Sequence, residues 1–533
     1  MRSTVPIRRA LISVSDKSQL VELGKAFQKQ KIEIVATGGS AKVLKDSGIN
    51  VIPIESVTGQ PEAFQGRMKT LSFEVCSGIL YRRGDEADEH DRNSLKIPSI
   101  DCVVVNFYPF EETAKHYDAR DSNQRGPLIE QIDIGGPTLV RAAAKNAPDV
   151  LVLTDPGQYQ RAIEELETHH GEVTVEYSYK CSNSAWGAVL KYDQAIYDTL
   201  VNEKIALRYG ENPHQKAHLN VHSASPIAWP KSQSESLTGQ SVSYNNLLDF
   251  SAAYDLCAQL KHRFPSHTHA VIVKHANPCG VASVENSLPQ AQKQAITFAW
   301  EGDSISAFGG IVCLSDRLTE DTAAFLQERF IEGLAAPELS KESPSLKLIV
   351  EKRKRLKAVQ VKAFETESEL RSLSVTGGVL FQTPDEIESN ESYQTPTQLK
   401  IDSKKMNLVS FGVGVCQSLK SNAIALVRQI PHGFQLVGAG QGQPNRIEAL
   451  TSLAIPRALR TLNESSLSGG LSDCILISDA FFPFPDAVES AAKLGIQEVV
   501  QPGGSRKDKE VIQRCDDLGV AMLMTGMRHF RHS

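Results

Sequence analysis

The stretch Val271–Ala282, "VIVKHANPCGVA", joins two apolar, strand-like runs through a polar segment. Lys274 and His275 stand side by side where the first run ends. Adjacent side chains of a strand point to opposite faces, so both can line one pocket only where the strand ends and the chain turns. We expect residues 277–280, "NPCG", to supply that turn, because asparagine, proline and glycine favour turns. The stretch therefore predicts a catalytic pair at the end of a buried strand.

Other interpretations of this stretch stay open on the residues alone. A buried histidine is more often a hydrogen-bonded core residue than a catalyst, but a lysine beside it favours catalysis, because buried lysines are rare unless paired or functional. Cys279 is a candidate nucleophile, although no sequence feature singles out a base that would activate it.

The bulk composition excludes several classes of protein. The chain has 533 residues, which predicts two or three domains, and it is 41% hydrophobic and 23% charged. A net charge of −6 gives no indication of a nucleic-acid or anionic-membrane partner, so any basic surface must be a local pocket for an anionic small molecule. The one dense basic run, "EKRKRLK" (351–357), is interpreted as a solvated helix face.

The nine cysteines are scattered and form no Cys-x-x-Cys pair. This argues against a disulfide framework and a structural zinc site, and it predicts a cytoplasmic protein. No segment approaches 18 continuous apolar residues, so no membrane span is expected. The apolar run near the N-terminus is too short for a secretion signal.

Strand and helix patterns alternate over the first 155 or so residues, which predicts a mostly parallel sheet. In "DIGGPTLVRAAAKN" (133–146) we expect a glycine turn, then an alanine-rich helix with Pro137 at its first position. A helical pattern gives way to a turn-rich segment near residues 200–215, so we expect one domain over 1–200 and a larger α/β region over 201–533. The predicted strands of the first domain span 10–14, 32–36, 51–54, 101–110 and 150–155.

Polar residues follow these strands in five segments: "SVSDK" (13–17), "TGGS" (37–40), "GRMKT" (66–70), "NFYPF" (106–110) and "DIGG" (133–136). Ligands of open parallel sheets bind at the carboxyl ends of the strands, and helix N-termini there favour anions. Each segment alone could be a capping loop, but five together predict a phosphate pocket. Lys69, Tyr108, Asp133 and Lys145 are candidates for acid–base chemistry or charge stabilisation, although a lysine as late on its helix as Lys145 is usually only a favourable charge.

The second region carries further polar clusters at strand ends. Glycine turns with arginine and asparagine suit phosphate and amide recognition, and "FFPF" (481–484) offers an apolar wall for a flat ring. The clusters are "RYGENPHQ" (208–215), "SAFGG" (306–310), "KSNAI" (420–424), "GAGQGQPNR" (438–446), "SDAFFPFPD" (478–486), "QPGGSRKD" (501–508) and "MRHFRH" (527–532).

With these motifs in this order, nearly the whole chain resembles the bifunctional purine-biosynthesis family that joins AICAR formyltransferase to IMP cyclohydrolase. The resemblance implies an α/β fold with an N-terminal methylglyoxal-synthase-like parallel-sheet domain. It implies a C-terminal transformylase domain with a duplicated cytidine-deaminase-like fold and an intertwined homodimer. The implied reactions are formyl transfer from 10-formyltetrahydrofolate to AICAR, giving FAICAR, and cyclodehydration of FAICAR to IMP.

The resemblance also implies roles for single residues in the transferase. AICAR's amino group is a poor nucleophile, so His275 is the expected base, Lys274 the stabiliser of the developing oxyanion, and Asn422 the residue that orients the substrate amide. The matching AICAR contacts are Arg208, Tyr209, Gly309, Glu332, Arg446, Phe481 and Arg528, and the folate contacts are Ile447, Asp486, Ser505 and Arg506.

In the cyclohydrolase domain the catalytic set by resemblance is Lys69, Tyr108, Asp133 and Lys145. The matching substrate-binding positions are Ser15, Asp16, Lys17, Thr37, Gly38, Gly39, Ser40, Arg67, Thr70, Asn106 and Ile134. 10-Formyltetrahydrofolate is the cosubstrate and no catalytic metal is expected. Some members hold a structural potassium ion, for which Asp479 is a possible ligand here.

Two departures from the family pattern fall in the cyclohydrolase domain. Ser72 and Phe73 replace a His-Pro pair, and Cys76 replaces a second histidine. Further on, "AWGAVLKYD" (185–193) stands where the family has a Phe-x-His-Thr-Ala run before Tyr-Asp. A formyltransferase with a degenerate cyclohydrolase domain is therefore one alternative.

Two alternatives from other classes remain. A non-enzymatic nucleotide sensor is one, because phosphate loops alone do not imply turnover. A zinc deaminase is the other, but that site needs a Pro-Cys-x-x-Cys run, and Val281 and Ala282 follow Cys279–Gly280 here.

Overall fold

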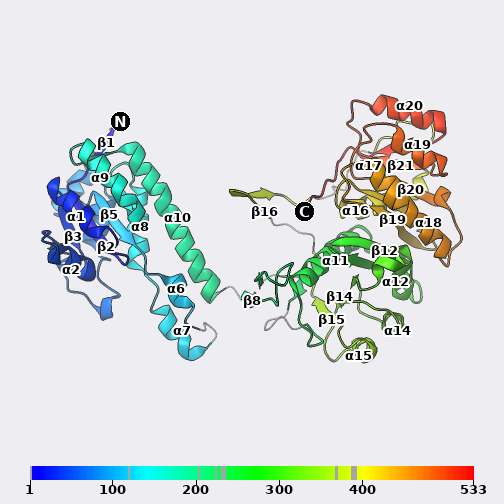
Figure 1. Cartoon of the computed structure of the whole chain (residues 1–533), viewed down its shortest axis with the longest axis horizontal. Helices are drawn as coiled ribbons and strands as arrows, with labels where there is room; N and C mark the ends of the chain where they lie inside the picture. The colour runs from blue at the N-terminus through cyan, green and yellow to red at the C-terminus, as the bar shows by residue number, and fades with distance from the viewer. Residues whose placement is uncertain are drawn as a thin grey trace. The chain divides into compact units, whose positions relative to one another are not determined.

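The computed structural model describes residues 3–117, 121–201, 204–221, 225–229, 236–365, 370–385 and 393–532. The chain divides into two compact units, Met1–Glu203 and Lys204–Ser533 (Figure 1).

The N-terminal unit is built on a five-stranded parallel sheet in the order β4-β3-β2-β5-β6. Its strands are almost continuously apolar, as expected when helices cover both faces of a parallel sheet. The strands are β2 (Arg9–Val14), β3 (Glu33–Ala36), β4 (Ile52–Pro53), β5 (Cys102–Asn106) and β6 (Leu151–Leu153), and β1 (Thr4–Pro6) pairs separately with β7 (Glu172–Thr174). The predicted alternation of strands and helices is confirmed.

Alternate residues of each strand pack against different helices. In β2, Ile12 joins a core with α1 and α9, whereas Leu11 joins one with α4, α8 and α10. The helices are α1 (Leu20–Lys29), α2 (Gly38–Asp46), α3 (Glu55–Thr58), α4 (Phe73–Leu80), α5 (Glu86–Ser94), α6 (Phe110–Ala114), α7 (Ser122–Ile129), α8 (Gly135–Lys145), α9 (Tyr159–Thr168) and α10 (Val175–Leu200). Pro137 is the third residue of α8 rather than the first, because the helix already begins at Gly135.

The C-terminal unit is built on one eleven-stranded sheet in the order β10-β15-β14-β13-β11-β12-β19-β18-β20-β21-β22. The strands are β10 (Ile227–Ala228), β11 (His267–Lys274), β12 (Asn277–Glu285), β13 (Ile311–Leu314), β14 (Gly333–Pro337), β15 (Lys357–Val361), β18 (Ile424–Ile430), β19 (Gly433–Gly440), β20 (Cys474–Ser478), β21 (Glu498–Gln501) and β22 (Ala521–Met524). The short pair β8 (Lys204–Ala206) and β9 (His218–Asn220) lies outside this sheet.

The unit is an internal duplication. Strands β11 to β15 and strands β18 to β22 pair in the same way: an antiparallel hairpin, an antiparallel third strand, then two parallel strands. β12 and β19 join the two repeats by antiparallel pairing. The expected duplicated α/β fold is therefore confirmed. The helices are α11 (Tyr244–Arg263), α12 (Ala291–Gly302), α13 (Ser304–Ala307), α14 (Glu320–Gln327), α15 (Pro344–Lys352), α16 (Met406–Gln417), α17 (Arg446–Glu448), a π-helical turn Ala449–Ala454, α18 (Ile455–Glu464), α19 (Asp486–Lys493) and α20 (Asp508–Leu518).

These pairing directions gather the candidate residues at one edge of the sheet, which we call the site edge. It is the edge at which β11, β19, β20, β21 and β22 end and β12, β13, β14, β15 and β18 begin. Almost all transferase candidates lie in the loops along it.

The prediction that the basic run 351–357 is a solvated helix face is only partly confirmed. Glu351, Lys352, Lys354 and Arg355 are exposed, but only the first two belong to a helix. α15 ends at Lys352, Leu356 is buried, and Lys357 begins β15 at the site edge. No helix in the described part of the chain is long and apolar enough to cross a membrane.

A hairpin made of β16 (Arg371–Val375) and β17 (Gly378–Gln382) projects from the C-terminal unit (Figure 1). Its apolar side chains are exposed, with Phe381 67% and Leu380 59% accessible. An isolated two-stranded hairpin is marginally stable in water, so these side chains need a partner surface.

We predict that His269 makes the C-terminal unit less stable at mildly acidic pH. His269 is fully buried in β11, with Nδ1 2.7 Å from Ser283 Oγ and Nε2 3.1 Å from the Phe264 carbonyl oxygen. Burial lowers its pKa to about 3. The unfolded chain therefore binds a proton below about pH 6.5 that the folded chain does not, and stability falls as pH falls.

The measurement is urea unfolding of wild type and His269→Gln near pH 7.5 and near pH 5. The difference in unfolding free energy between the wild type and His269→Gln is expected to shift by about 2 kcal/mol against the wild type as pH falls from 7.5 to 5. A difference that stays constant would show that His269 does not titrate in this way.

Candidate active sites

The turn between β11 and β12 consists of His275 and Ala276, not of residues 277–280 as the sequence predicted. Both residues are in the left-handed region, with φ of 53° and 56°, and Lys274 pairs directly with Asn277. Two-residue hairpin turns of this hand fit the twist of the strands, but they normally use asparagine and glycine. His275 is exposed at the tip, and Lys274 beside it is half-buried.

Asp249 of α11 holds this turn. Its Oδ1 accepts a hydrogen bond of 2.6 Å from the backbone N–H of Ala276. Burial raises the pKa of Asp249, while a hydrogen bond from the Ala276 backbone, the charge of His275 and a hydrogen bond from the His275 backbone oppose the rise.

Lys274 lies against the start of β13. Its Nζ donates a hydrogen bond of 2.6 Å to the carbonyl oxygen of Phe308. Gly309 follows with φ of 75°, and a Cβ there would lie 3.2 Å from the Phe330 ring and 3.6 Å from Lys274 Nζ. Glycine therefore leaves room for the ammonium group beside two exposed aromatic rings, those of Phe308 and Phe330, which are tilted by 44° with their centroids 5.1 Å apart.

Glu332, just before β14, belongs to the same cluster. Its carboxylate lies 3.0 Å from Lys357 Nζ. Burial would raise the pKa of Glu332, but hydrogen bonds from Lys357 and Asn246 and the charge of Lys274 outweigh it and lower the pKa. Glu332 is therefore an anion between two lysines.

Cys279 lies in β12, where its thiol contacts the Ile272 carbonyl oxygen at 3.4 Å. Burial raises its pKa to about 12. Because the thiolate is the reactive form, this geometry disfavours Cys279 as a nucleophile.

A second cluster forms around Asn422, just before β18. Its Oδ1 accepts from Arg446 at 2.8 Å, and its Nδ2 donates to the carbonyl oxygens of Gln443 and Pro444 at 3.0 and 3.1 Å. Arg446 also binds Asp479 at 2.9 Å. The Asn422 amide is thus fixed from both ends.

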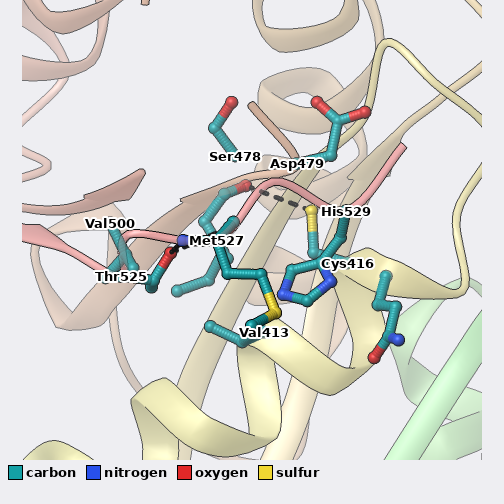
Figure 2. Close-up of a pocket in the computed structure, with 10 residues that line it drawn as sticks. Val413, Cys416, Ser478, Asp479, Val500, Thr525, Met527 and His529 are labelled. Carbon is teal, nitrogen blue, oxygen red and sulfur yellow. Dashed lines mark hydrogen bonds between the residues drawn. The ribbon is translucent and has the colours of Figure 1, made fainter. Parts of the chain in front are cut away.

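Asp479 is fully buried at the end of β20, and it also accepts a 2.6 Å hydrogen bond from Ser421. It lines a cavity of about 10 Å³ together with Cys416 of α16 and Ser478, Thr525 and His529 (Figure 2). That volume suits one water molecule or one small ion.

The remaining candidates of this unit lie further along the site edge. Ile447 lies after β19, Asp486 starts α19 after β20, Ser505 and Arg506 follow β21, and Arg528 follows β22. Phe481 is half-buried, whereas Phe482 is fully buried, so "FFPF" is not a continuous aromatic wall.

Arg208 and Tyr209 follow β8, outside the large sheet, with the guanidinium 5.2 Å from the centre of the tyrosine ring. Asn245 of α11 donates to the Glu211 carbonyl oxygen at 3.2 Å, which ties this loop to the helix that carries Asp249.

In the N-terminal unit, segments 13–17, 37–40 and 106–110 lie at the carboxyl ends of β2, β3 and β5, as predicted, whereas segments 66–70 and 133–136 follow helical segments rather than strands. Asn106, the last residue of β5, accepts from the backbone N–H groups of Ser15 and Asp16 at 2.6 and 2.9 Å. Ser40 accepts from Val14 N at 3.1 Å, and Thr37 donates to Ser13 Oγ at 3.0 Å. These bonds order the loops after β2 and β3.

Basic side chains approach the same loops. A Cβ on Gly38 would lie 2.9 Å from Lys69 Nζ, and one on Gly39 would lie 3.8 Å from Lys17 Nζ. Lys69 pairs with Glu62 at 2.6 Å, and Arg67 pairs with Glu130. Thr70 lies beside the start of α8, since a Cβ on Gly135 would be 2.8 Å from its Oγ1.

Asp133 lies at the start of α8, where its Oδ1 accepts from Gly136 N at 2.8 Å. Burial raises the pKa of Asp133, and the Gly136 and Gly135 N–H groups oppose that rise. Tyr108 and Ile134 are 56% and 61% exposed. A half-buried acid with a raised pKa beside exposed surface can exchange a proton with a ligand.

Lys145 lies away from Asp133 and Lys69 in the N-terminal unit, because it is at the opposite end of α8 from Asp133. It is the last residue of α8, exposed, and α8 runs back along the sheet for about 15 Å from Gly135.

The departures at residues 72–76 form an ordinary helix start. Ser72 caps α4 by accepting from Val75 N at 3.2 Å, and Phe73 is 63% exposed. Cys76 is half-buried on α4, and burial raises its pKa.

Sequence reasoning missed Asn246, Asp249, Lys357 and Tyr192. The i, i+3 spacing of Asn246 and Asp249 on one helix was a usable signal. Tyr192 of α10 accepts from the backbone N–H of Asp133 through its hydroxyl at 2.7 Å, and its ring lies 4.9 Å from that of Phe107.

We predict that Tyr192→Phe destabilises the N-terminal unit by about 1–2 kcal/mol, because the half-buried Asp133 N–H then lacks an acceptor. The matched control is Tyr197→Phe on the exposed part of the same helix, which should change stability little. Denaturant unfolding checks this, and equal effects of the two variants would contradict it.

Two family models match the chain, and the second of them along the sequence begins within the N-terminal unit. The model of the AICARFT/IMPCHase bienzyme family matches residues 143–457, and that of the MGS-like domain matches residues 19–138. The chain is 36% identical to the bifunctional purine biosynthesis protein PurH of Gloeothece citriformis, covering 98% of this chain and all of that protein. It is 37% identical to PurH of Acetivibrio thermocellus and 36% identical to PurH of Bacillus subtilis, in each case over 99% of this chain and all of the relative. The chain therefore belongs to the bifunctional AICARFT/IMPCHase family.

Proposed function

We propose that this chain catalyses formyl transfer from 10-formyltetrahydrofolate to AICAR and the closure of the product, FAICAR, to IMP. The transfer is assigned to residues 201–533 and the closure to residues 1–200. The observation that carries the proposal is the presentation of Lys274 and His275 at the tip of the β11–β12 hairpin.

The transfer needs a base and a cation at one place. The AICAR amino nitrogen attacks the formyl carbon, its proton passes to His275, and the C–N bond to folate breaks as tetrahydrofolate leaves with a proton. Lys274 stabilises the oxyanion that forms on the formyl oxygen, and its amine already faces a carbonyl oxygen, that of Phe308.

Two copies of the chain complete the transferase site in this proposal. β11 and β18 are three strand spacings apart, so Lys274 and Asn422 are about 14 Å apart along the site edge. Asn422 cannot orient the amide next to the amine that the same copy's His275 deprotonates. A homodimer that apposes two site edges solves this, and the exposed β16–β17 hairpin supplies apolar surface for a second copy.

The neighbouring loops suit the two substrates. Arg446, Arg528 and Arg208 suit the phosphate of AICAR, with Tyr209, Gly309, Glu332 and Phe481 around the rest of the molecule. The loops with Ile447, Asp486, Ser505 and Arg506 form the folate side.

In the cyclohydrolase domain, the ordered loops after β2, β3 and β5 bind the phosphate of FAICAR. Asp133 and Lys69 flank the reacting atoms in this proposal. Asp133 is suited to proton transfer by its raised pKa, and Lys69 approaches the start of α2, where the phosphate loops lie. Tyr108 is exposed beside them. Lys145 would reach this centre only from another copy or after a rearrangement, so it stays a proposal from the family alone.

We favour a working cyclohydrolase over a degenerate one. The replaced residues fit an ordinary helix, because Ser72 caps α4 and Cys76 lies within it. Lys69 contacts the loop at Gly38, and Asp133 contacts the start of α8 at Gly136. A nucleotide sensor without turnover is the second alternative, and it leaves the Lys274–His275 arrangement without a role.

A structural potassium ion is proposed for the small cavity beside Asp479. Ser478, Asp479 and Thr525 bring oxygen atoms to its lining, and its volume of about 10 Å³ suits a single ion. The compartment proposed is the cytoplasm, because all nine cysteines are free thiols.

The function is tested by variants that separate the two steps. His275→Ala should lower tetrahydrofolate release by roughly 10²–10⁴-fold and leave FAICAR closure to IMP unchanged. Lys69→Ala should do the opposite, with a loss of closure of roughly 10²–10³-fold. Wild-type protein that gives IMP from FAICAR no faster than buffer would establish the degenerate domain, and binding without either turnover would favour the sensor.

The two-copy site is tested by complementation. His275→Ala and Asn422→Ala are each expected to be nearly inactive in transfer. In a random mixture of the two variants, half the dimers contain one copy of each. In such a dimer one site combines the intact His275 of one copy with the intact Asn422 of the other, so about a quarter of wild-type transfer should return. No recovery in confirmed mixed dimers would show that each copy carries a whole site.

A further inference from the structure

The turn that carries His275 is energetically unfavourable by itself. A β-carbon in the left-handed region clashes with the neighbouring carbonyl oxygen, and here two successive non-glycine residues, His275 and Ala276, adopt it. Such conformations persist only where surrounding contacts hold them.

Asp249 supplies the contact that holds this turn. Its carboxylate reaches from α11 to the Ala276 N–H at 2.6 Å, and α11 packs along β11. One turn earlier on the same helix, the buried Asn246 is fixed by a capping box with Ser243 and hydrogen-bonds Glu332. The start of α11 therefore fixes both the hairpin tip and the anion beside Lys274.

We propose that Asp249 is a positioning residue of the formyl transfer, which sets the orientation of His275 by accepting the backbone hydrogen bond of Ala276. The role rests on the proposed function, because it concerns the base of that reaction. Asp249 acts through the backbone of the turn, so a neutral acceptor of the same shape can replace it, and a charge is not required.

A glycine offers an independent way to hold the turn. At position 276 it adopts positive φ without the steric cost, and it is the residue that two-residue turns of this hand prefer at their second position. A variant that lacks the Asp249 acceptor should therefore recover when Ala276 becomes glycine, which would not happen if Asp249 exchanged protons with His275.

The test measures transfer by the full-length protein with AICAR and 10-formyltetrahydrofolate in four variants. Asp249→Ala should lower kcat roughly 10–100-fold with little change in KM for AICAR. Asp249→Asn should keep most of kcat, and Asp249→Ala with Ala276→Gly should recover part of it. Ser251→Ala, exposed on the same helix, is the matched control and should equal wild type. Circular dichroism and denaturant unfolding of the full-length protein report correct folding of each variant.

The outcomes separate the role from the function. Unchanged kcat in Asp249→Ala would overturn the positioning role, and so would Asp249→Asn as impaired as Asp249→Ala with no rescue by glycine. No tetrahydrofolate release by the wild type would overturn the proposed function, and with it any role of Asp249 in the transfer.

Discussion

The antiparallel pairing of β12 with β19 is the contact on which the C-terminal unit depends. It joins two copies of one α/β pattern into a continuous sheet, in the register Ala282 with Gln435 and Val284 with Gly433. The strands come so close that a Cβ on Gly433 would lie 2.0 Å from the Ser283 carbonyl oxygen. Gln435 is fully buried at this joint and bonds Arg428 on one side and the Phe298 carbonyl oxygen on the other.

That joint also decides where the chemistry lies. Since each neighbouring pair from β13 to β20 is antiparallel, the tip of the first hairpin and the start of the second share one edge. Lys274 and His275 thus lie in line with Asn422 and Arg446, although long stretches of sequence separate them. Within one copy, the cluster around Lys274 and the cluster around Asn422 lie too far apart along this edge to contact the same small substrate. The proposed site therefore includes a second copy.

Much of this architecture was predictable because it rests on local patterns. Apolar runs between glycine-rich turns marked the strands, and the polar segments after them marked the loops of the N-terminal sheet. The turn at His275–Ala276 was not predictable, because two non-glycine residues at positive φ have no local signature and are held by Asp249 from a helix earlier in the chain. Lys357 was hidden in a basic run that resembles a solvated helix, and only the sheet shows that it faces Glu332.

The two units differ in how far their parts are preassembled. In the N-terminal unit the loops around Asn106 and the start of α8 are already hydrogen-bonded, while Tyr108 and Ile134 are exposed. In the C-terminal unit the side chains around Lys274 and those around Asn422 are each held by hydrogen bonds, but the two clusters lie apart along the site edge.

The most direct measurement incubates the wild-type protein with AICAR and 10-formyltetrahydrofolate and follows tetrahydrofolate and IMP separately. We expect both to appear, with IMP formed from the FAICAR that the transfer releases. Tetrahydrofolate with accumulating FAICAR would contradict the cyclohydrolase assignment. Neither product from a folded protein that binds AICAR would contradict the assignment of both activities.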